Sequence, residues 1–385
     1  MANFTFQSPP RVICETGGLA RMGEVMKGLG VMRAIVVCDA GIAACGFSDR
    51  AVAALTSAGL EATVFDGVQA DPPVKIVRTA VDAARAFGAD GVVGLGGGSS
   101  LDTAKLVALL IDSDQILEEM YGTDLARGRR VPLIQVPTTS GTGSEVTWVS
   151  VVTSDANEKK AIYSSQLLPD VALLDAELTL GMPPHVTAAT ALDAMVHAIE
   201  AYTSRTRKNV VSDTLAVKAL ALLGKNLRRV VADGSDIEAR SAMLQGSMLA
   251  GMAFVNASVA AVHALSYPLG TRFHIPHGHS NALVMGPVMR FNMPVAERAY
   301  AELAVHLLPD RSFANDKEAA EAFVSELEQL VSSVGLETRL SRLGVTEADI
   351  PDMAREVTVG IQRLIVNNPR AMNLDEVAGL YRAVL

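Results

Sequence analysis

The sequence predicts two domains: an α/β domain with a parallel sheet over residues 1–180, and an all-helical domain over residues 181–385. Three observations lead to this fold class. At roughly 150 residues per domain, a chain of 385 residues is long enough for two or three domains. From residue 31 to about 175, β-rich runs alternate with helical stretches. After Pro183-Pro184, almost every segment suits a helix.

The first half contains three strand-then-helix pairs. Their ranges are 34–38 with 49–58, 61–65 with 74–87, and 91–95 with 101–111. Such repetition is typical of a parallel sheet covered by helices, and ligands of these sheets bind beyond the C-terminal ends of the strands.

The second half contains helical patterns with few strand candidates between them. The expected helices are 187–203, 209–227, 236–252, 257–269, 295–307, 316–334 and 374–384. The proline pair marks the domain boundary, and Thr187 is available as a helix cap.

Composition excludes several classes of protein. The chain is 49% hydrophobic and has 33 basic and 42 acidic residues, a net charge of −9, so neither disorder nor nucleic-acid binding is expected. Three cysteines without a C-x-x-C spacing indicate reduced thiols in the cytoplasm. Apolar runs such as 106–111 are far shorter than the roughly 20 residues of a membrane span. We therefore expect small-molecule partners, and no membrane.

A glycine-rich turn follows the strand expected at 91–95. Gly96, Gly97, Gly98 and Ser99 remove large side chains where the backbone enters a helix, so free N–H groups and the helix dipole could bind a phosphate. The turn matches neither G-x-G-x-x-G nor the Walker pattern. The alternative is an ordinary tight strand-to-helix turn.

Two further polar positions follow expected strands. Thr138, Thr139 and Thr142 come after the apolar run 131–136, where their hydroxyls could bind a nucleotide or only cap a loop. Asp39 closes the strand expected at 34–38, where it could accept hydrogen bonds from ribose hydroxyls and repel a 2′-phosphate. The alternative for Asp39 is a cap.

A carboxylate and several histidines form a candidate metal site. Asp193 and His197 are four residues apart and share one face of the expected helix 187–203, among apolar neighbours. Downstream imidazoles are at His263, His274, His277 and His279. One carboxylate with three imidazoles suits Fe(II) or Zn(II), whereas a mutual Asp–His hydrogen bond would need no metal. The segment 273–280 is expected to be a turn, because it contains Pro276 and Gly278, and spacing alone cannot choose among its three histidines.

Four motifs in order make the chain resemble the iron-containing (group III) alcohol dehydrogenases. They lie at 96–105, 137–146, 193–200 and 276–278, and the resemblance covers nearly the whole chain. It implies a Rossmann-like dinucleotide-binding domain at 1–180 and a helical metal- and substrate-binding domain at 181–385.

The resemblance also implies particular site residues. The family's metal ligands fall on Asp193, His197, His263 and His277, which leaves His274 and His279 as non-ligands. Its cofactor contacts fall on Asp39, Gly96, Gly97, Gly98, Ser99, Asp102, Thr138, Thr139, Thr142 and Lys159.

Two positions depart from the family pattern. Tyr267 stands where many members have a histidine, and Asp71 precedes Pro72 where the family often has asparagine. Residues expected to shape the substrate pocket are Tyr267, His279 and Phe254, with Trp148 and Val151 also near the metal.

The resemblance implies an oxidoreductase that transfers a hydride between a small alcohol and NAD, giving an aldehyde or ketone. It needs a divalent metal, Fe(II) first and Zn(II) or Mn(II) next. The alternatives are a maleylacetate reductase-like enzyme, a hydroxyacid-oxoacid transhydrogenase, a dehydroquinate synthase-like lyase or a metal-dependent hydrolase. We expect a homo-oligomer, a dimer, in the cytoplasm.

Overall fold

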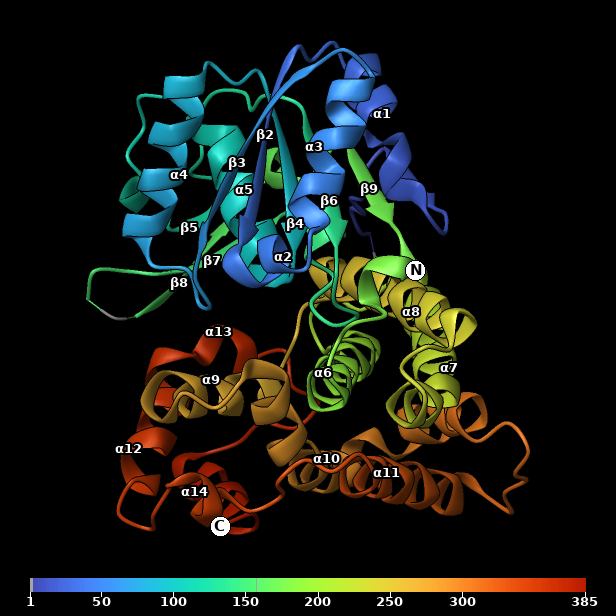
Figure 1. The fold of residues 1–385 in the computed structure, drawn as a ribbon. Coiled ribbons are helices and arrows are strands. Elements are labelled where there is room, and N and C mark those ends of the chain that lie inside the picture. Colours follow the sequence, from blue (N-terminus) through green and yellow to red (C-terminus); the bar gives the residue numbers. More distant parts are fainter. Residues whose placement is uncertain (1–2, 157) are drawn as a thin grey trace. The chain divides into compact units, whose positions relative to one another are not determined.

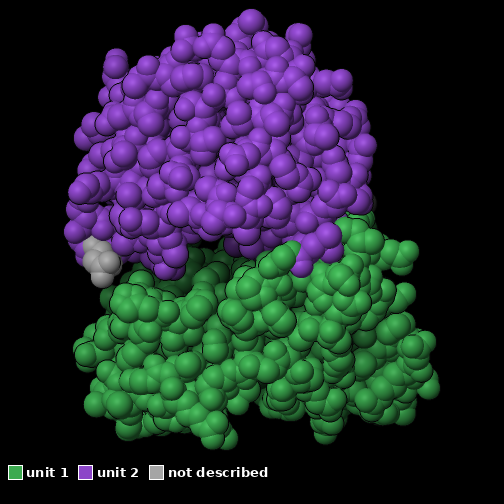
Figure 2. Space-filling view, viewed as in Figure 1, with its two compact units in different colours: residues 1–6, 181–385 green, residues 7–180 purple. Residues whose placement is uncertain are grey.

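The computed structural model describes residues 3–156 and 158–385. It divides the chain into two compact units, Gln7–Leu180 and Gly181–Leu385, and residues 3–6 belong to the second (Figure 2). The first unit combines strands and helices, and the second is helical (Figure 1).

The first unit is built on a six-stranded parallel sheet with the order β1-β9-β6-β4-β2-β3. Its strands are β1 (Arg11–Cys14), β2 (Arg33–Asp39), β3 (Glu61–Val68), β4 (Gly91–Gly96), β6 (Leu133–Pro137) and β9 (Val171–Leu174). The predicted parallel sheet is therefore confirmed, and β4 and β6 at its centre are buried along their whole length.

Helices cover both faces of this sheet, and the alternation of β2 side chains explains why. Ile35 and Val37 belong to the apolar cluster with α4 (Val74–Phe87) and α5 (Gly98–Leu110). Ala34 and Val36 point to the opposite face and join the cluster with α1 (Met22–Gly28) and α3 (Phe47–Ser57). The short helix α2 (Ala40–Ala44) follows β2 directly.

A second, small sheet was not expected from the sequence. It has the order β5-β8-β7, with β5 (Gly122–Thr123), β7 (Val149–Thr153) and β8 (Lys159–Tyr163). Its strands are short, and few of their residues are buried, so the apolar signal is too weak to detect in sequence.

The second unit confirms the predicted all-helical half. Its helices are α6 (Pro184–Thr203), α7 (Val210–Ala232), α8 (Ile237–Ala257), α9 (Ala261–Phe273), α10 (His277–Leu307), α11 (Asp316–Ser333), α12 (Ile350–Arg355), α13 (Gln362–Ile365) and α14 (Leu374–Arg382). None of residues 181–385 lies in a strand. Helix α6 is buried along most of its length and packs against α7, α8 and α10.

The predicted helix starts at 187, 257 and 295 and the predicted turn at 273–280 are wrong. The helices predicted from 257 and 295 begin instead at Ala261 and His277. Thr187 does not cap α6, because the helix already begins at Pro184, where proline's missing N–H is not needed. The segment 273–280 is not a turn throughout, since α10 begins at His277 and continues through Pro287 and Pro294. The packing of α10 on α6 and α11 keeps this helix continuous despite both prolines.

Among the described residues, no single helix is long and apolar enough to span a membrane. One bent pair, α8 with α9, passes the same test jointly, with an angle of 105° between its members.

A glycine lets α10 approach α6 where the predicted metal ligands lie. A Cβ atom on Gly278 would be 2.2 Å from the carbonyl oxygen of Ala189 and 3.3 Å from the Cβ atom of Asp193. The shorter distance is impossible without movement of the backbone, so only glycine fits. His277 is thereby held next to the turn of α6 that carries Asp193.

Replacing Gly278 with alanine is expected to force α10 away from α6. Overpacking against a rigid backbone costs about 1–3 kcal/mol, so the thermal midpoint should fall by several degrees. Gly379→Ala in α14 is the matched control. Apart from the chain neighbours and the helix's own backbone, no atom of the described residues lies within 4 Å of the Cβ atom that alanine would add there, and alanine is the better helix former. Differential scanning calorimetry of both variants checks this, and a Gly278→Ala midpoint at or above wild type would contradict it.

A buried polar network joins α5 to the segment that follows β6. Lys105 Nζ donates to Ser144 Oγ (2.8 Å), Thr147 Oγ1 (3.0 Å) and the carbonyl oxygen of Val149 (2.7 Å). Glu145, 1% exposed, lies near this ammonium, and among the described residues its Oε1 has no hydrogen-bond partner. Burial raises the pKa of Glu145 to about 7, although its own backbone N–H and Lys105 partly oppose the shift.

The raised pKa of Glu145 predicts a stability that falls with rising pH. Because the folded pKa of about 7 exceeds the ordinary value, the folded protein keeps a proton that the unfolded chain releases. This contribution is present below about pH 4.5 and is lost as the pH rises through about 7. Glu145→Gln should therefore match wild type at pH 5 and be more stable by up to about 3 kcal/mol at pH 8.5.

Thermal midpoints at both pH values test this, with Glu24→Gln on the exposed face of α1 as the control. A Glu145→Gln advantage that does not grow with pH would contradict a buried, titrating carboxyl.

Candidate functional site

Helix α6 presents three ionisable side chains on one face. Asp193, His197 and Glu200 are spaced four and three residues apart, so they follow one another along the helix. All three are buried, with side chains at most 6% exposed. An apolar helix that carries three such groups inward must receive partners from neighbouring helices.

Those partners come from the starts of α9 and α10. His263 Nε2 and His277 Nε2 each lie 3.6 Å from Asp193 Oδ1, and the three atoms are all within 4.8 Å of one another. Two ligands of a tetrahedral ion, each about 2.1 Å from it, are about 3.4 Å apart. The donor types and their spacing therefore fit a divalent metal.

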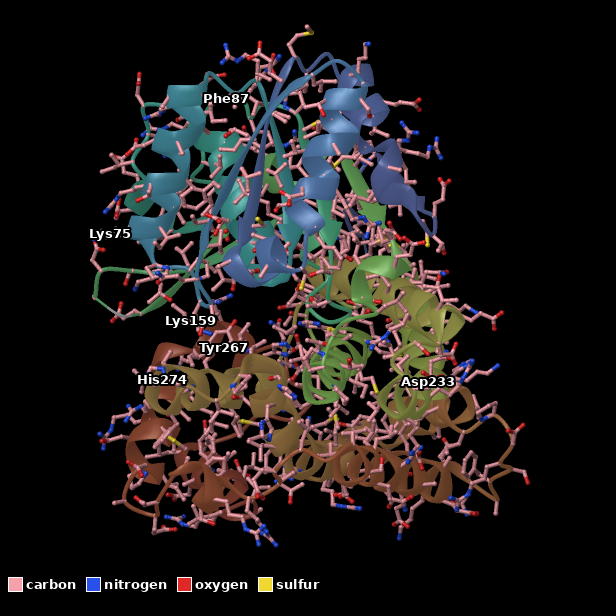
Figure 3. All side chains as sticks on the ribbon, viewed as in Figure 1. Lys75, Phe87, Lys159, Asp233, Tyr267 and His274 are labelled. Atoms are coloured by element: carbon pink, nitrogen blue, oxygen red, sulfur yellow. The ribbon has the colours of Figure 1, made fainter. Side chains whose placement is uncertain are left out.

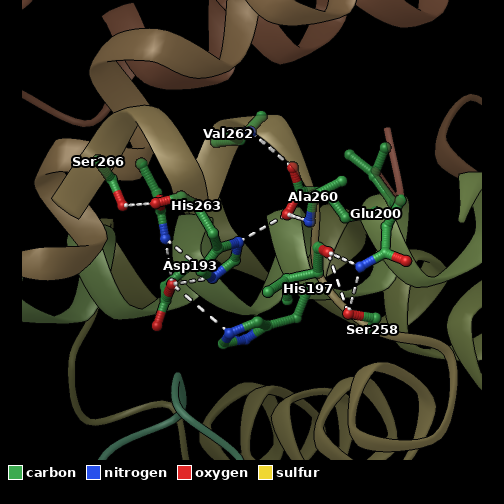
Figure 4. Close-up of polar contacts among 12 residues, drawn as sticks. Asp193, His197, Glu200, Ser258, Ala260, Val262, His263 and Ser266 are labelled. Atoms are coloured by element: carbon green, nitrogen blue, oxygen red, sulfur yellow. Dashed lines mark hydrogen bonds and ion pairs between the residues drawn. The ribbon is translucent and has the colours of Figure 1, made fainter. Parts of the chain in front are cut away.

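His197 lies at the edge of this group. Its Nε2 is 3.9 Å from Asp193 Oδ1, and its ring stacks on His263 (4.6 Å between centroids) and on Phe254 (4.2 Å). The structure thus brings together all four side chains predicted as ligands, with His197 outside the tightest trio. Figure 4 shows Asp193, His197 and His263 side by side.

Opposite charges stabilise the ionised forms of this cluster. Burial by itself would raise the pKa of Asp193, but the imidazoles of His197, His277 and His263 outweigh it and hold the pKa far below its usual range. Burial would lower the pKa of His263, yet hydrogen bonds to Asp193 and Glu200 raise it to about 9.

Two members of the cluster were missed in the sequence. Glu200 accepts a hydrogen bond from His263 Nδ1 at 2.7 Å, and Asn281 Nδ2 donates to Asp193 Oδ1 at 2.6 Å. Asn281 Oδ1 is buried and has no hydrogen-bond partner among the described residues. Glu200 is three residues after His197 and Asn281 is four after His277, but spacing along one helix does not show which side chains of another helix lie opposite.

The remaining histidines and pocket candidates differ in their surroundings. His274 is exposed at the end of α9, in a left-handed conformation with φ of 55° (Figure 3). His279 Nε2 donates to the carbonyl oxygen of Glu337 at 2.7 Å, so its ring anchors a loop. Tyr267 lies on α9 with its ring 6.1 Å from that of His277, and Phe254 covers His197.

The predicted phosphate turn lies in the first unit, between β4 and α5. Gly96 has φ of 144°, and a Cβ atom there would lie 2.8 Å from Ser100 Oγ. Side chains at Gly97 and Gly98 would approach Thr139 and Thr142, at 3.5 Å and 2.8 Å. Because glycine has no side chain, the backbone N–H groups at the start of α5 stay uncovered. Uncovered N–H groups at the start of a helix suit a pyrophosphate.

The second polar turn adjoins the first because β4 and β6 are parallel neighbours. Gly96 pairs in register with Pro137, and the N–H of Thr138 donates to the carbonyl oxygen of Gly96. Asp39, at the end of β2, caps α2 by accepting from the N–H groups of Gly41 and Ile42, and its Oδ2 accepts from Ser100 Oγ. Asp39 is thus a helix cap, as the alternative interpretation expected, and it also lies beside the glycine turn.

Two other predicted cofactor residues have protein partners. Asp102 accepts from Ser144 Oγ (2.6 Å) and from the N–H of Val151 (2.8 Å), which ties α5 to β7. Lys159, labelled in Figure 3, forms an ion pair with Asp71 at 2.8 Å. Trp148, which directly precedes β7, packs edge-on against the ring of Tyr163 at the end of β8.

Family models match both units. The model described as iron-containing alcohol dehydrogenase matches residues 9–176, and the model described as Fe-containing alcohol dehydrogenase family, C-terminal, matches residues 187–385.

Individual relatives match along their full length. Long-chain-alcohol dehydrogenase 1 of Geobacillus thermodenitrificans is 38% identical over 378 residues, covering 97% of this chain and 95% of the relative. NAD-dependent methanol dehydrogenase of Bacillus methanolicus is 32% identical, with 100% of both chains covered. A crystal structure of 1,3-propanediol oxidoreductase has a TM-score of 0.96 and 34% identity over 100% of both chains. These matches confirm the resemblance, and the chain belongs to the iron-containing alcohol dehydrogenase family.

Proposed function

We propose that the protein is a metal-dependent dehydrogenase that transfers a hydride between a small alcohol and NAD, giving an aldehyde or ketone. The observation that carries this proposal is the group of Asp193, His263 and His277, whose ligand atoms lie within 4.8 Å of one another. Asp193 and His263 are buried, and His277 is half-buried. Related enzymes are named for the small alcohols methanol and 1,3-propanediol, and another is named for long-chain alcohols. From the first two we propose a small alcohol or aldehyde as the substrate.

Fe(II) is the ion that we propose for this site, with Zn(II) and Mn(II) as replacements. Asp193, His197, His263 and His277 would hold it, because a carboxylate with imidazoles has intermediate hardness. When bound, the metal would lower the pKa of an alcohol oxygen, and NAD would supply the hydride acceptor.

The chain's own residues would bind the reactants and exclude water. Phe254 covers the ring of His197 and, with Tyr267, would border the substrate. Gly96, Gly97 and Gly98 would admit the pyrophosphate to the N–H groups at the start of α5, with Ser99 and the threonines of the second turn beside it. We assign His279 to anchoring the loop at Glu337 rather than to the pocket.

The direct experiment is an assay of metal-stripped protein, refilled with Fe(II), Zn(II) or Mn(II), against a panel of small alcohols with NAD and small aldehydes with NADH. We expect turnover that needs both metal and nucleotide. Metal-loaded protein that gives no NADH fluorescence enhancement and no turnover would instead favour a hydrolase. The dimeric, cytoplasmic state stays a prediction, tested by sedimentation and fractionation.

The neighbouring histidines provide a matched pair of variants. His277→Ala should abolish stoichiometric metal binding and turnover, because its Nε2 is one of the three close donors. His274→Ala should retain both, since that side chain is exposed at the end of α9. Metal content by atomic emission and kcat check this. Normal metal content in His277→Ala, or equal loss in His274→Ala, would overturn the ligand assignment.

Asp39 should set the preference for NAD over NADP. Its carboxylate would repel the 2′-phosphate by about 1–3 kcal/mol, or roughly ten- to a hundredfold in kcat/KM. Asp39→Asn removes the charge but keeps a good helix cap. We therefore expect the ratio of kcat/KM with NADP to kcat/KM with NAD to rise, while the thermal midpoint stays unchanged.

Asp39→Ala is the control for capping, because it removes both the charge and the acceptor for Gly41 and Ile42. It should raise the ratio similarly and also lower the thermal midpoint. A ratio that does not move in Asp39→Asn, or a wild type that already prefers NADP, sinks the assignment.

A further inference from the structure

Glu200 occupies an unusual position for a carboxylate, because it is buried within the helical unit and accepts three close hydrogen bonds. Oε2 accepts from the N–H of Ala260 (2.7 Å) and from His263 Nδ1 (2.7 Å), and Oε1 accepts from the N–H of Val262 (2.7 Å). The residue is 2% exposed. Figure 4 shows these contacts around the first turn of α9.

The hydrogen bond to His263 determines which ring nitrogen carries a proton. An ionised carboxylate can only accept, so the proton between Glu200 Oε2 and His263 must lie on Nδ1. In the neutral ring, Nε2 then holds the lone pair, and Nε2 is the atom 3.6 Å from Asp193 Oδ1. Glu200 thereby turns the ligand atom of His263 toward the candidate metal.

The two backbone hydrogen bonds hold the N–H groups of Ala260 and Val262, at the start of the helix that carries His263. Just before this start, Ser258 has φ of 79°, and Asn367 Nδ2 donates to its hydroxyl at 2.8 Å. Because α6 carries both Asp193 and Glu200, one helix sets the position of a ligand directly and that of a second ligand through the carboxylate.

We propose that Glu200 is a positioning residue that selects the tautomer of His263 and aims its Nε2 at the metal. The inference rests on the proposed metal site. Carboxylate partners of metal-bound histidines typically change metal affinity by about 10- to 100-fold when they are removed. Nothing in this role requires Glu200 to touch the metal or the substrate.

Glu200→Gln is the variant that tests the proposal. Its amide can replace one carboxylate oxygen, but its NH2 group must then face a donor, either the His263 ring or the Val262 N–H. We expect the affinity for Co(II), measured by chelator competition, to fall by about 10- to 100-fold, with a changed visible spectrum of bound Co(II).

Ser266→Ala is the matched control. Ser266 Oγ donates to the backbone carbonyl oxygen of His263 at 2.9 Å, so its loss disturbs the same turn of α9 without touching the imidazole. Co(II) affinity and spectrum should match wild type in this variant, even if its thermal midpoint falls. If the Co(II) affinity of the Glu200→Gln variant is within about twofold of wild type and its spectrum is unchanged, Glu200 only holds the start of α9 and the proposal is overturned.

A measurement on the wild type covers the case in which Glu200→Gln fails to fold. Nitrogen-15 NMR of histidine-labelled, Zn(II)-loaded protein, assigned with His263→Ala, should give a protonated Nδ1 and a ligating Nε2 for His263. The opposite tautomer would overturn the inference. If the wild-type protein binds neither Co(II) nor Zn(II), the proposed function itself is refuted. If it binds metal but Glu200→Gln leaves the affinity unchanged, only the role of Glu200 is refuted.

Discussion

The buried carboxylate of Asp193 is the constraint on which the helical unit depends. An ionised group inside an apolar helix is tolerated only when opposite charges or hydrogen bonds surround it. Here the surroundings come from His263 on α9 and from His277 and Asn281 on α10. Three helices must therefore meet at one point, and Gly278 removes the side chain that would keep α10 away from α6.

The sheet unit depends on a different constraint: the backbone N–H groups of the glycine turn after β4 must not be covered by side chains. Because β4 and β6 are parallel neighbours, the turns that follow them lie together at one edge, and the glycines of the first turn face Thr139 and Thr142 of the second. The Lys105 network behind these turns fixes them from within. Rigid support on the inner side leaves the outer side free for a ligand.

Much of this arrangement could be predicted from sequence, because it is periodic. Strand β2 and helix α4 follow the predicted ranges closely, since each buries a regular apolar pattern. The start of α10 could not be predicted, because Pro276, Gly278 and the two later prolines suggest turns, and only packing against α6 makes the segment helical. Glu200 and Asn281 were missed for a related reason: their role depends on which helix lies opposite, and spacing within one helix does not give that.

X-ray absorption at the zinc edge of Zn(II)-loaded protein tests the central claim most directly, that side chains of α6, α9 and α10 converge on one ion. The account predicts nitrogen and oxygen neighbours at about 2.0–2.2 Å, with outer-shell scattering from the three imidazoles of His197, His263 and His277. A sulfur neighbour at about 2.3 Å, or scattering from fewer than two imidazoles, would contradict it.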